Sequence, residues 1–140
     1  ELQPKETYLE KNCITYRQRM YKIGSDKKYD AARAKWGGSW RLPTKEEFKE
    51  LIQECKWKWT TQNGKKGYKV TGPNGNSIFL PATGYFNGSS LYNVGERGDY
   101  WSSTPYDNGG YASIFNFNSS GRYQNWDNRY YGLTVRPVSE

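Results

Sequence analysis

Turn-forming residues are dense from Gly72 to the end of the chain, and this feature most limits what the chain can fold into. Glycine, proline, asparagine, aspartate and serine interrupt the apolar stretches there, so short strands and loops fit between them. Before Gly72, two stretches instead have the 3.6-residue spacing of helices. Helices that come first and short strands that follow predict an α+β fold, with a small antiparallel sheet and long structured loops.

The clearest helix is predicted in "TKEEFKELIQEC", residues 44–55. Thr44 as N-cap and Glu47 three residues later form a capping box, in which each side chain satisfies a backbone N–H at the helix start. Four apolar residues then follow at i, i+3, i+4 and i+7 and form one stripe: Phe48, Leu51, Ile52 and Cys55. Such a stripe is typical of a helix that faces the core.

Other elements are expected on weaker patterns. A shorter helix is predicted in "GSDKKYDAARAKWGG", with Ser25 or Asp26 as the cap and Gly37 as the end. Strands are predicted near residues 13–21, on both sides of the turn "GPNGN", and in "GDYWSST", "YASIFNF" and the closing "GLTVRPV". Trp36, Trp40, Trp101 and Trp126 are expected in the core, because large aromatic side chains are mostly buried.

The net charge of +7 is distributed unevenly. Residues 1–70 contain 17 basic and 9 acidic side chains, whereas residues 71–140 contain 4 and 5. In the basic half both signs alternate at helical spacing, which indicates solvated helix faces rather than a nucleic-acid site. We therefore expect no nucleic-acid partner. The neutral second half must select its ligand by something other than gross charge.

The chain has two cysteines and no histidine. This composition disfavours most transition-metal sites and most acid–base catalysis near neutral pH, so we expect no enzyme activity, no metal and no cofactor. Cys13 and Cys55 either form a disulfide or are two buried small hydrophobic residues, and the sequence leaves both open. A length of 140 residues suits one domain over residues 1–140. No apolar run of 18 residues occurs, which predicts no membrane insertion, and no signal peptide is visible at Glu1.

The stretch from Tyr106 to Tyr131 has an unusual composition, since 18 of its 26 residues are Tyr, Asn, Ser, Gly or Asp. A disordered segment would be poor in aromatic residues, because nothing in it would offset the entropy of ordering. Recognition loops, in contrast, use Tyr for rigid amphipathic contacts and Ser, Gly and Asn for hydrogen bonds. We therefore expect this stretch to form a structured binding surface.

Four blocks occur in a characteristic order: "AARAKWGGSWRLPTKEEFKELI", "FLPATGYF", "GDYWSST" and "RYYGLTVRPV". Together they resemble the Fibrobacter succinogenes major paralogous domain, a bacterial family with the C-type lectin fold. The resemblance covers about residues 30–138. It implies that fold, with two helices packed on a small antiparallel sheet. Formylglycine-generating relatives of the fold use a reactive cysteine pair near the C-terminus, which Cys13 and Cys55 do not match.

The family is similar to the variable proteins of diversity-generating retroelements. In those proteins the ligand-binding surface lies between a Trp-Ser-Ser block and a closing Arg-x-x-Gly-x-x-Val-Arg block, here residues 101–103 and 129–136, which implies a variable region at 100–138. Adenine-directed mutagenesis of Asn codons cannot create Lys, Glu or Met, and residues 100–139 contain none of these. Trp101, Gln124 and Trp126 also fall outside the reachable set and should be framework. Either active diversification or the composition of non-diversified family members explains this pattern.

Alternation along "YASIFNFN" places Phe115 and Phe117 on a core face and Asn116 and Asn118 on a presented face. The resemblance adds neighbouring strand and loop positions. The candidate ligand-binding residues are Tyr106, Asn108, Tyr111, Ser113, Asn116, Asn118, Tyr123, Asn125, Asp127, Tyr130 and Tyr131. For each Tyr the alternative is a half-buried packing residue. Arg129 and Arg136 are expected to pin the loop through carboxylates or carbonyls, with Asp99 and Asp107 available.

These observations predict a non-enzymatic, receptor- or adhesin-type ligand-binding domain of a secreted, cell-surface or phage-displayed bacterial protein. Eleven positions could cover much of the roughly 800 Å² per partner of a standard protein interface, which favours a protein ligand over a small glycan. Tyr123, Tyr130 and Tyr131 would be its anchors. The alternatives are an assembly module of a surface protein and a calcium-independent carbohydrate-binding domain. Calcium is not expected, because residues 72–74 and 125–127 lack the carboxylate pattern of calcium-binding lectins.

Overall fold

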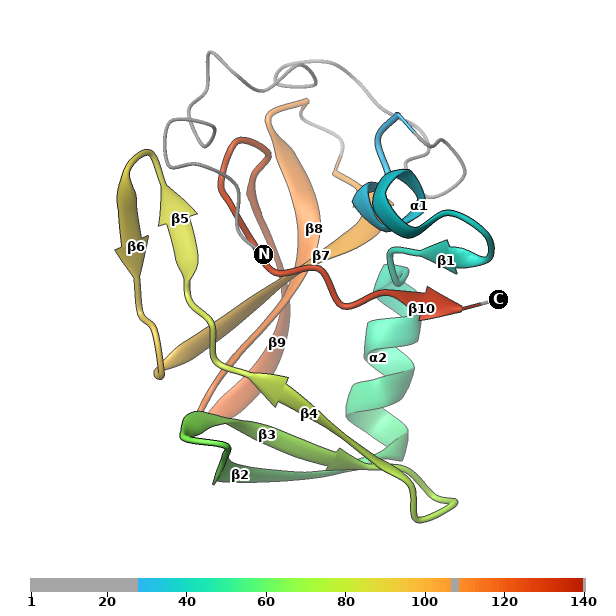
Figure 1. Cartoon of the computed structure of the whole chain (residues 1–140), viewed down its shortest axis with the longest axis vertical. Coiled ribbons are helices and arrows are strands. Elements are labelled where there is room, and N and C mark those ends of the chain that lie inside the picture. The colour runs from blue at the N-terminus through green and yellow to red at the C-terminus, as the bar shows by residue number, and fades with distance from the viewer. Residues whose placement is uncertain (1–27, 107–108, 140) are drawn as a thin grey trace.

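Two helices and ten strands make up the part of the chain that the computed structural model describes, residues 28–106 and 109–139 (Figure 1). The helices are α1 (Ala31–Trp36) and α2 (Lys45–Glu54). The strands are β1 (Trp40–Arg41), β2 (Lys56–Gln62), β3 (Lys65–Thr71), β4 (Ser77–Pro81), β5 (Tyr85–Asn87), β6 (Ser90–Tyr92), β7 (Arg97–Pro105), β8 (Tyr111–Asn118), β9 (Gly121–Asn128) and β10 (Val138–Ser139).

The strands form four small antiparallel sheets. Two of them have three strands each, in the orders β2-β3-β4 and β7-β8-β9, and the hairpin β5-β6 and the pair β1-β10 complete the set. All the strand ladders are antiparallel. The expected α+β class, with antiparallel pairing, is confirmed.

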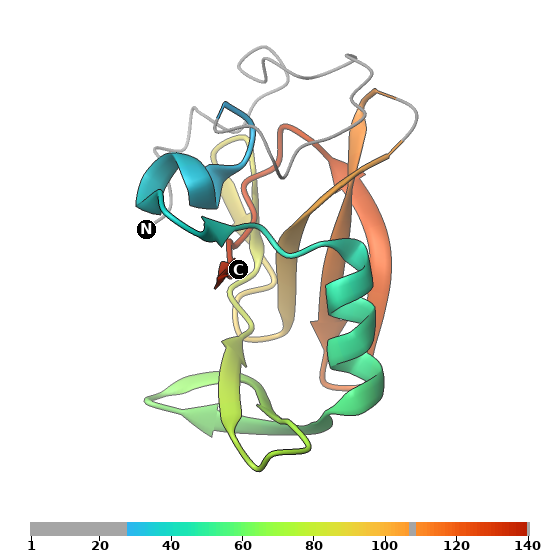
Figure 2. The same cartoon turned by 90° about the vertical axis from the view of Figure 1, so that its right-hand side faces the viewer.

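The helix α2 begins and packs as its sequence predicts. The Thr44 hydroxyl accepts from the Glu47 backbone N–H at 3.1 Å, and the Glu47 carboxylate accepts from the Thr44 backbone N–H at 3.0 Å, which completes the capping box. Arg41 also pairs with Glu47, and this hydrogen bond keeps the pKa of the Glu47 carboxyl below its ordinary value. The helix lies along one face of the β7-β8-β9 sheet (Figures 1 and 2).

The helix α1 begins later than the sequence suggested. Asp30, rather than Ser25 or Asp26, is its N-cap, and its carboxylate accepts from the backbone N–H groups of Ala32 and Arg33. The same carboxylate accepts from the backbone N–H of Leu42, which ties the helix start to the chain after β1. Gly37 ends the helix, as expected, with a φ of 65° that suits glycine.

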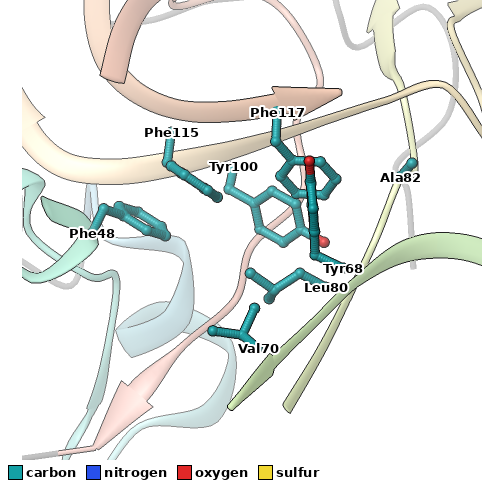
Figure 3. Packing of buried hydrophobic residues seen from close by; sticks show 8 residues of the cluster. All are labelled: Phe48, Tyr68, Val70, Leu80, Ala82, Tyr100, Phe115 and Phe117. Carbon is teal, nitrogen blue, oxygen red and sulfur yellow. The ribbon is translucent and has the colours of Figure 1, made fainter. Parts of the chain in front are cut away.

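The core lies between α2, the β2-β3-β4 sheet and the β7-β8-β9 sheet (Figure 3). The Phe48 ring of α2 stacks on Phe115 of β8, with centroids 4.9 Å apart. Phe117, also on β8, packs against Tyr100 and Tyr68. Gly98 of β7 makes this packing possible, because a Cβ there would lie 2.2 Å from the Phe117 ring. The core is thus built mainly of aromatic rings.

Several strands differ from the sequence-based prediction. Strands β2, β5, β6 and β9 lie in segments for which the sequence predicted no strand. The segment predicted as a closing strand forms isolated bridges at Gly132 and Thr134, and its regular pairing begins at Val138. The strand predicted near residues 13–21 lies outside the described residues.

Candidate functional site

Strand register gathers polar side chains on the face of the β7-β8-β9 sheet that lies opposite Phe115 and α2. Directly paired residues of antiparallel strands share a face, as do residues two apart along a strand. Asp99 pairs with Asn116, and Asn116 pairs with Tyr123. We call this surface the outer face and define it by six residues: Arg97, Asp99, Asn116, Tyr123, Asn125 and Asp127.

An arginine–carboxylate pair joins two positions of β7 on the outer face. Nε and Nη2 of Arg97 both donate to Oδ1 of Asp99, at 3.0 and 2.7 Å. The Asn116 amide, oriented so that both of its ends are satisfied, accepts from Arg97 Nη2 and donates to the Tyr123 carbonyl, at 3.3 Å each. The three strands are therefore linked across the outer face by side chains as well as by their backbone ladders.

Asp99 is an unusual group, because its side chain is fully buried. Its second oxygen, Oδ2, has no hydrogen-bond partner among the described residues. Burial raises the pKa of Asp99 to about 6, although the Arg97 guanidinium acts in the opposite direction. Burial also raises the pKa of Asp127 on β9 above its ordinary value. The outer face therefore carries two carboxyl groups and one guanidinium.

A row of tyrosines borders the outer face. Tyr85 of β5 stacks on Tyr92 of β6 at 5.4 Å and on Tyr131 at 5.6 Å between ring centroids. We call Tyr92, Tyr85 and Tyr131 the tyrosine row. The Arg97 guanidinium lies 5.3 Å from the centroid of the Tyr85 ring. Burial raises the pKa of Tyr85, and the negative charges of Asp127 and Asp99 contribute to this shift, so the row lies within electrostatic reach of both carboxyls.

A second group of aromatic side chains lies on the opposite face of the β7-β8-β9 sheet. Tyr111 contacts Trp126 at 4.5 Å, and Tyr106 contacts both rings at 6.3 and 5.7 Å. Arg129 fixes this end of the sheet, since its Nε donates to the Tyr111 carbonyl at 2.7 Å. The expectation that Arg129 pins the region through carbonyls is confirmed. Asp99 pairs with Arg97 instead.

The structure divides the candidate binding residues between these two faces. Five of them point to the side of the sheet that carries the outer face: Asn116, Asn118, Tyr123, Asn125 and Asp127. Of these, Asn118 lies next to the six residues that define the outer face. Tyr131 belongs to the tyrosine row, and Tyr130 contacts it edge-on at 5.0 Å. Tyr106, Tyr111 and Ser113 belong to the opposite face. Asn108 lies outside the described residues. The sequence had treated all of them as one surface.

Burial corrects part of the site prediction. Asn116 is 8% exposed and Ser113 is 5% exposed. Consecutive residues of β8 point to opposite faces and are buried alike, so both faces of this strand are covered. The expectation that alternation presents the Asn face of this strand is therefore wrong at Asn116, although Asn118 is exposed. Tyr106, Tyr123 and Asn125 are exposed as predicted. The prediction of buried tryptophans is wrong for three of them, since Trp36, Trp40 and Trp126 are exposed.

Sequence reasoning missed four contributors to the outer face and its border: Tyr85, Tyr92, Arg97 and Asp99. All four precede the region proposed as variable. A partial signal existed for Arg97 and Asp99, because opposite charges two residues apart lie on the same face of a strand, but the predicted strand began at Gly98 and left Arg97 out. Tyr85 and Tyr92 gave no such signal, since only the β5-β6 hairpin and its contact with Tyr131 bring them to this site.

Two remaining sequence questions concern metals and cysteines. Among residues 28–106 and 109–139, no three His, Cys, Asp or Glu side chains are grouped as a metal site would require. Cys55 is a free cysteine that packs, half-buried, against the core. Cys13 lies outside the described residues, so the choice between a disulfide and two small hydrophobic residues stays as the sequence left it. No helix within the described part of the chain is long and apolar enough to cross a membrane.

Comparison with known proteins gives one family. The family model described as Lcl C-terminal domain matches residues 11–139. This is the Fibrobacter succinogenes major paralogous domain family, which is associated with variable proteins of diversity-generating retroelements, so the predicted resemblance is confirmed. Neither the curated proteins nor the solved structures give a match.

Proposed function

The chain belongs to the Lcl C-terminal domain family, and from this premise we propose that it is a non-enzymatic domain that binds a protein ligand through the outer face and the tyrosine row. The family supports a ligand-binding domain of the variable-protein type. A protein partner, a secreted, cell-surface or phage-displayed location and the C-type lectin fold are parts of the proposal.

The observation that carries the proposal is the arrangement of exposed polar and aromatic side chains over a rigid base. Tyr123 is 48% exposed, and Asn125 beside it on β9 is exposed as well. Beneath them the Arg97, Asp99 and Asn116 network holds three strands together. Tyrosine supplies large contact area at a low cost in side-chain entropy, and amides adapt their hydrogen bonds to a partner. The site combines both on strands rather than on mobile loops.

A screen of surface proteins, immobilised on an array and probed with the intact chain, tests this proposal. For any protein captured, Tyr123→Ala and Tyr131→Ala should each weaken binding by about 1–3 kcal/mol, the range of interface anchors. Trp36→Ala is the matched control, because this residue of α1 is 50% exposed and remote in the chain. Loss of binding in the control alone, or unchanged binding in both tyrosine variants, would contradict the proposed site.

A second candidate function is an assembly module of a surface protein. It is favoured by three exposed apolar residues at the β5-β6 hairpin and the turn after it: Leu91, Tyr92 and Val94. If this hairpin packs against another domain or copy, Leu91→Asp should abolish a concentration-dependent oligomer in light scattering. A chain that stays monomeric at all concentrations, with or without this substitution, would leave ligand binding as the function.

A further inference from the structure

We propose that the outer face contains a subsite for a basic side chain of the protein partner, a lysine ammonium or an arginine guanidinium, held between Asp99, Asp127 and the tyrosine row. This inference rests on the proposed function and names the chemistry that the same site selects. Both carboxyl groups would repel an acidic ligand, so the site is not expected to bind one.

The first support is the hydrogen bonding of Asp99. Both donors of Arg97 that reach Asp99 go to one oxygen, Oδ1. Oδ2 is buried and has no donor among the described residues, although the Asp99 side chain is fully buried. A buried carboxylate oxygen without a donor costs free energy that a bound N–H group recovers. An ammonium or guanidinium group supplies such a donor together with the opposite charge.

The second support is the balance of charge on the outer face. Arg97 pairs with Asp99, and its charge also opposes the effect of burial on the pKa of Asp127, so one guanidinium acts on two carboxyls and leaves an excess of one negative charge when both are ionised. Asp127 accepts from the backbone N–H of Asn128 at 2.9 Å. That donor is neutral and adds no positive charge. A ligand cation would offset the remaining negative charge and would favour the ionised form of both carboxyls.

The third support is the aromatic border. The rings of Tyr85 and Tyr131 are stacked at 26°, and the Arg97 guanidinium already lies over Tyr85. A cation is attracted to the face of an aromatic ring, and the attraction grows where water is excluded. Asp127 and Tyr131 are only half-buried, in contrast to Asp99. These two half-buried residues are therefore the ones that an entering side chain meets first.

A divalent metal fits the same residues less well. Calcium takes six to eight oxygen ligands. The outer face offers two carboxyls, and one oxygen of Asp99 is already bound to a guanidinium. A basic side chain needs only one or two acceptors and an apolar wall for its stem. The geometry therefore favours a basic side chain over a metal ion.

Nuclear magnetic resonance titration of the intact chain tests the subsite without a partner. The probes are N-acetyl-lysine methylamide and N-acetyl-arginine methylamide, with N-acetyl-norleucine methylamide as the uncharged control. We expect both cationic probes to shift the amide signals of Asp99, Asp127 and Tyr131 with dissociation constants of about 1–10 mM, a range normal for a single side chain. The uncharged probe should bind at least about tenfold more weakly, because it lacks both donor and charge.

Two variants and one control complete the test. Asp99→Asn and Asp127→Asn should each weaken binding of the cationic probes by about tenfold or more, and Glu54→Gln, an exposed carboxyl at the end of α2, should leave it unchanged. If Asp99→Asn does not fold, Asp127→Asn decides, since Asp127 is half-buried. Equal shifts from charged and uncharged probes, unchanged binding in Asp127→Asn, or the same shifts with calcium chloride would each overturn the subsite.

The two proposals fail in different ways. If the basic probes do not bind but Tyr123→Ala weakens capture of a protein partner, then the subsite is wrong and the proposed function stands. If the probes bind at Asp99 while no tyrosine variant affects a captured partner, then the cation subsite exists and the partner binds elsewhere.

Discussion

Asp99 is the single residue whose protonation should most affect stability. Burial raises the pKa of Asp99 to about 6 in the folded protein, against an ordinary value of about 3.9. The folded state therefore holds this proton more tightly than the unfolded state. The stabilisation that comes from this bound proton is fully present below about pH 4 and is lost as the pH rises through about 6. It amounts to at most about 3 kcal/mol of the free energy of unfolding.

Urea unfolding of the natural chain and of Asp99→Asn between pH 4 and 7 checks this. The natural chain should lose stability relative to the variant as the pH rises. The difference between the two curves is what counts, because the lowered pKa of Glu47 gives a contribution of the opposite sign in both proteins. Parallel curves would show that Asp99 titrates normally.

Two asparagines on neighbouring strands provide a matched comparison of burial. Asn116 is buried and its amide bridges Arg97 and the Tyr123 carbonyl, whereas Asn125 is exposed and accepts from the adjacent Trp126 N–H. Asn116→Ala should reduce the free energy of unfolding by about 1–3 kcal/mol, because it leaves buried partners unsatisfied. Asn125→Ala should change it by less than about 0.5 kcal/mol. Chemical denaturation measures both, and equal losses would contradict the assignment.

At the scale of single elements, the β2-β3 ladder contains an unfavourable charge pair. Lys58 lies directly opposite Lys69, and like charges in that position destabilise a sheet. Lys58→Glu should therefore raise the free energy of unfolding by about 0.2–1 kcal/mol at low salt, and the gain should shrink in 1 M salt as screening increases. Lys66→Glu is the control for net charge, because Lys66 faces Thr61. Equal gains in both variants would point to net charge rather than pairing.

Elements whose signals are local could be predicted from the sequence. The α2 capping box and apolar stripe need only residues 44–55, so its start and its buried face were both predicted. Strand β8 was also found, since its alternation is local. Strand β9 was missed because Gly121, Asn125 and Asn128 have low strand propensity, and pairing with β8 over its whole length overrides that preference.

The candidate site was predictable only where it lies on one segment. Tyr123, Asn125 and Asp127 were identified from composition and resemblance, and all three lie on the outer face. Burial of Asn116 could not be foreseen, because alternation assumes that one face of β8 meets solvent. In the structure, the Arg97 side chain of β7 and the Tyr123 carbonyl of β9 both bond to the Asn116 amide. Such contacts between distant segments leave no local trace in the sequence.

At the scale of the whole molecule, the segment proposed as variable is fixed to the framework at both ends. Gly132 pairs with Phe86 of β5, and Thr134 exchanges backbone hydrogen bonds with Asp99 and Trp101 of β7. The strand β10 then pairs with β1 far back in the chain (Figure 1). Exposed side chains between these ties can change without moving the backbone that carries them.

This division predicts how the chain tolerates simultaneous change. One library would randomise three exposed positions, Tyr106, Tyr123 and Asn125, and a second would randomise three buried ones, Ser113, Asn116 and Phe117. Three exposed changes should cost about 1.5 kcal/mol together, well within the 5–15 kcal/mol stability of a typical domain. Loss of Phe117 alone should cost about 3–5 kcal/mol, because its ring fills the core beside Gly98.

Surface display followed by protease challenge measures the outcome as the fraction of each library that survives. We expect survivors to be at least about tenfold more frequent in the exposed library, because a deficit of 1.4 kcal/mol per clone already changes the unfolded fraction tenfold. We expect this result if the three exposed positions, Tyr123 and Asn125 on the outer face and Tyr106 on the opposite face, do not cover the core and are carried by a separate framework. Similar survival in the two libraries would mean that Tyr106, Tyr123 and Asn125 hold the fold together, and a binding surface made of these residues could not vary independently of stability.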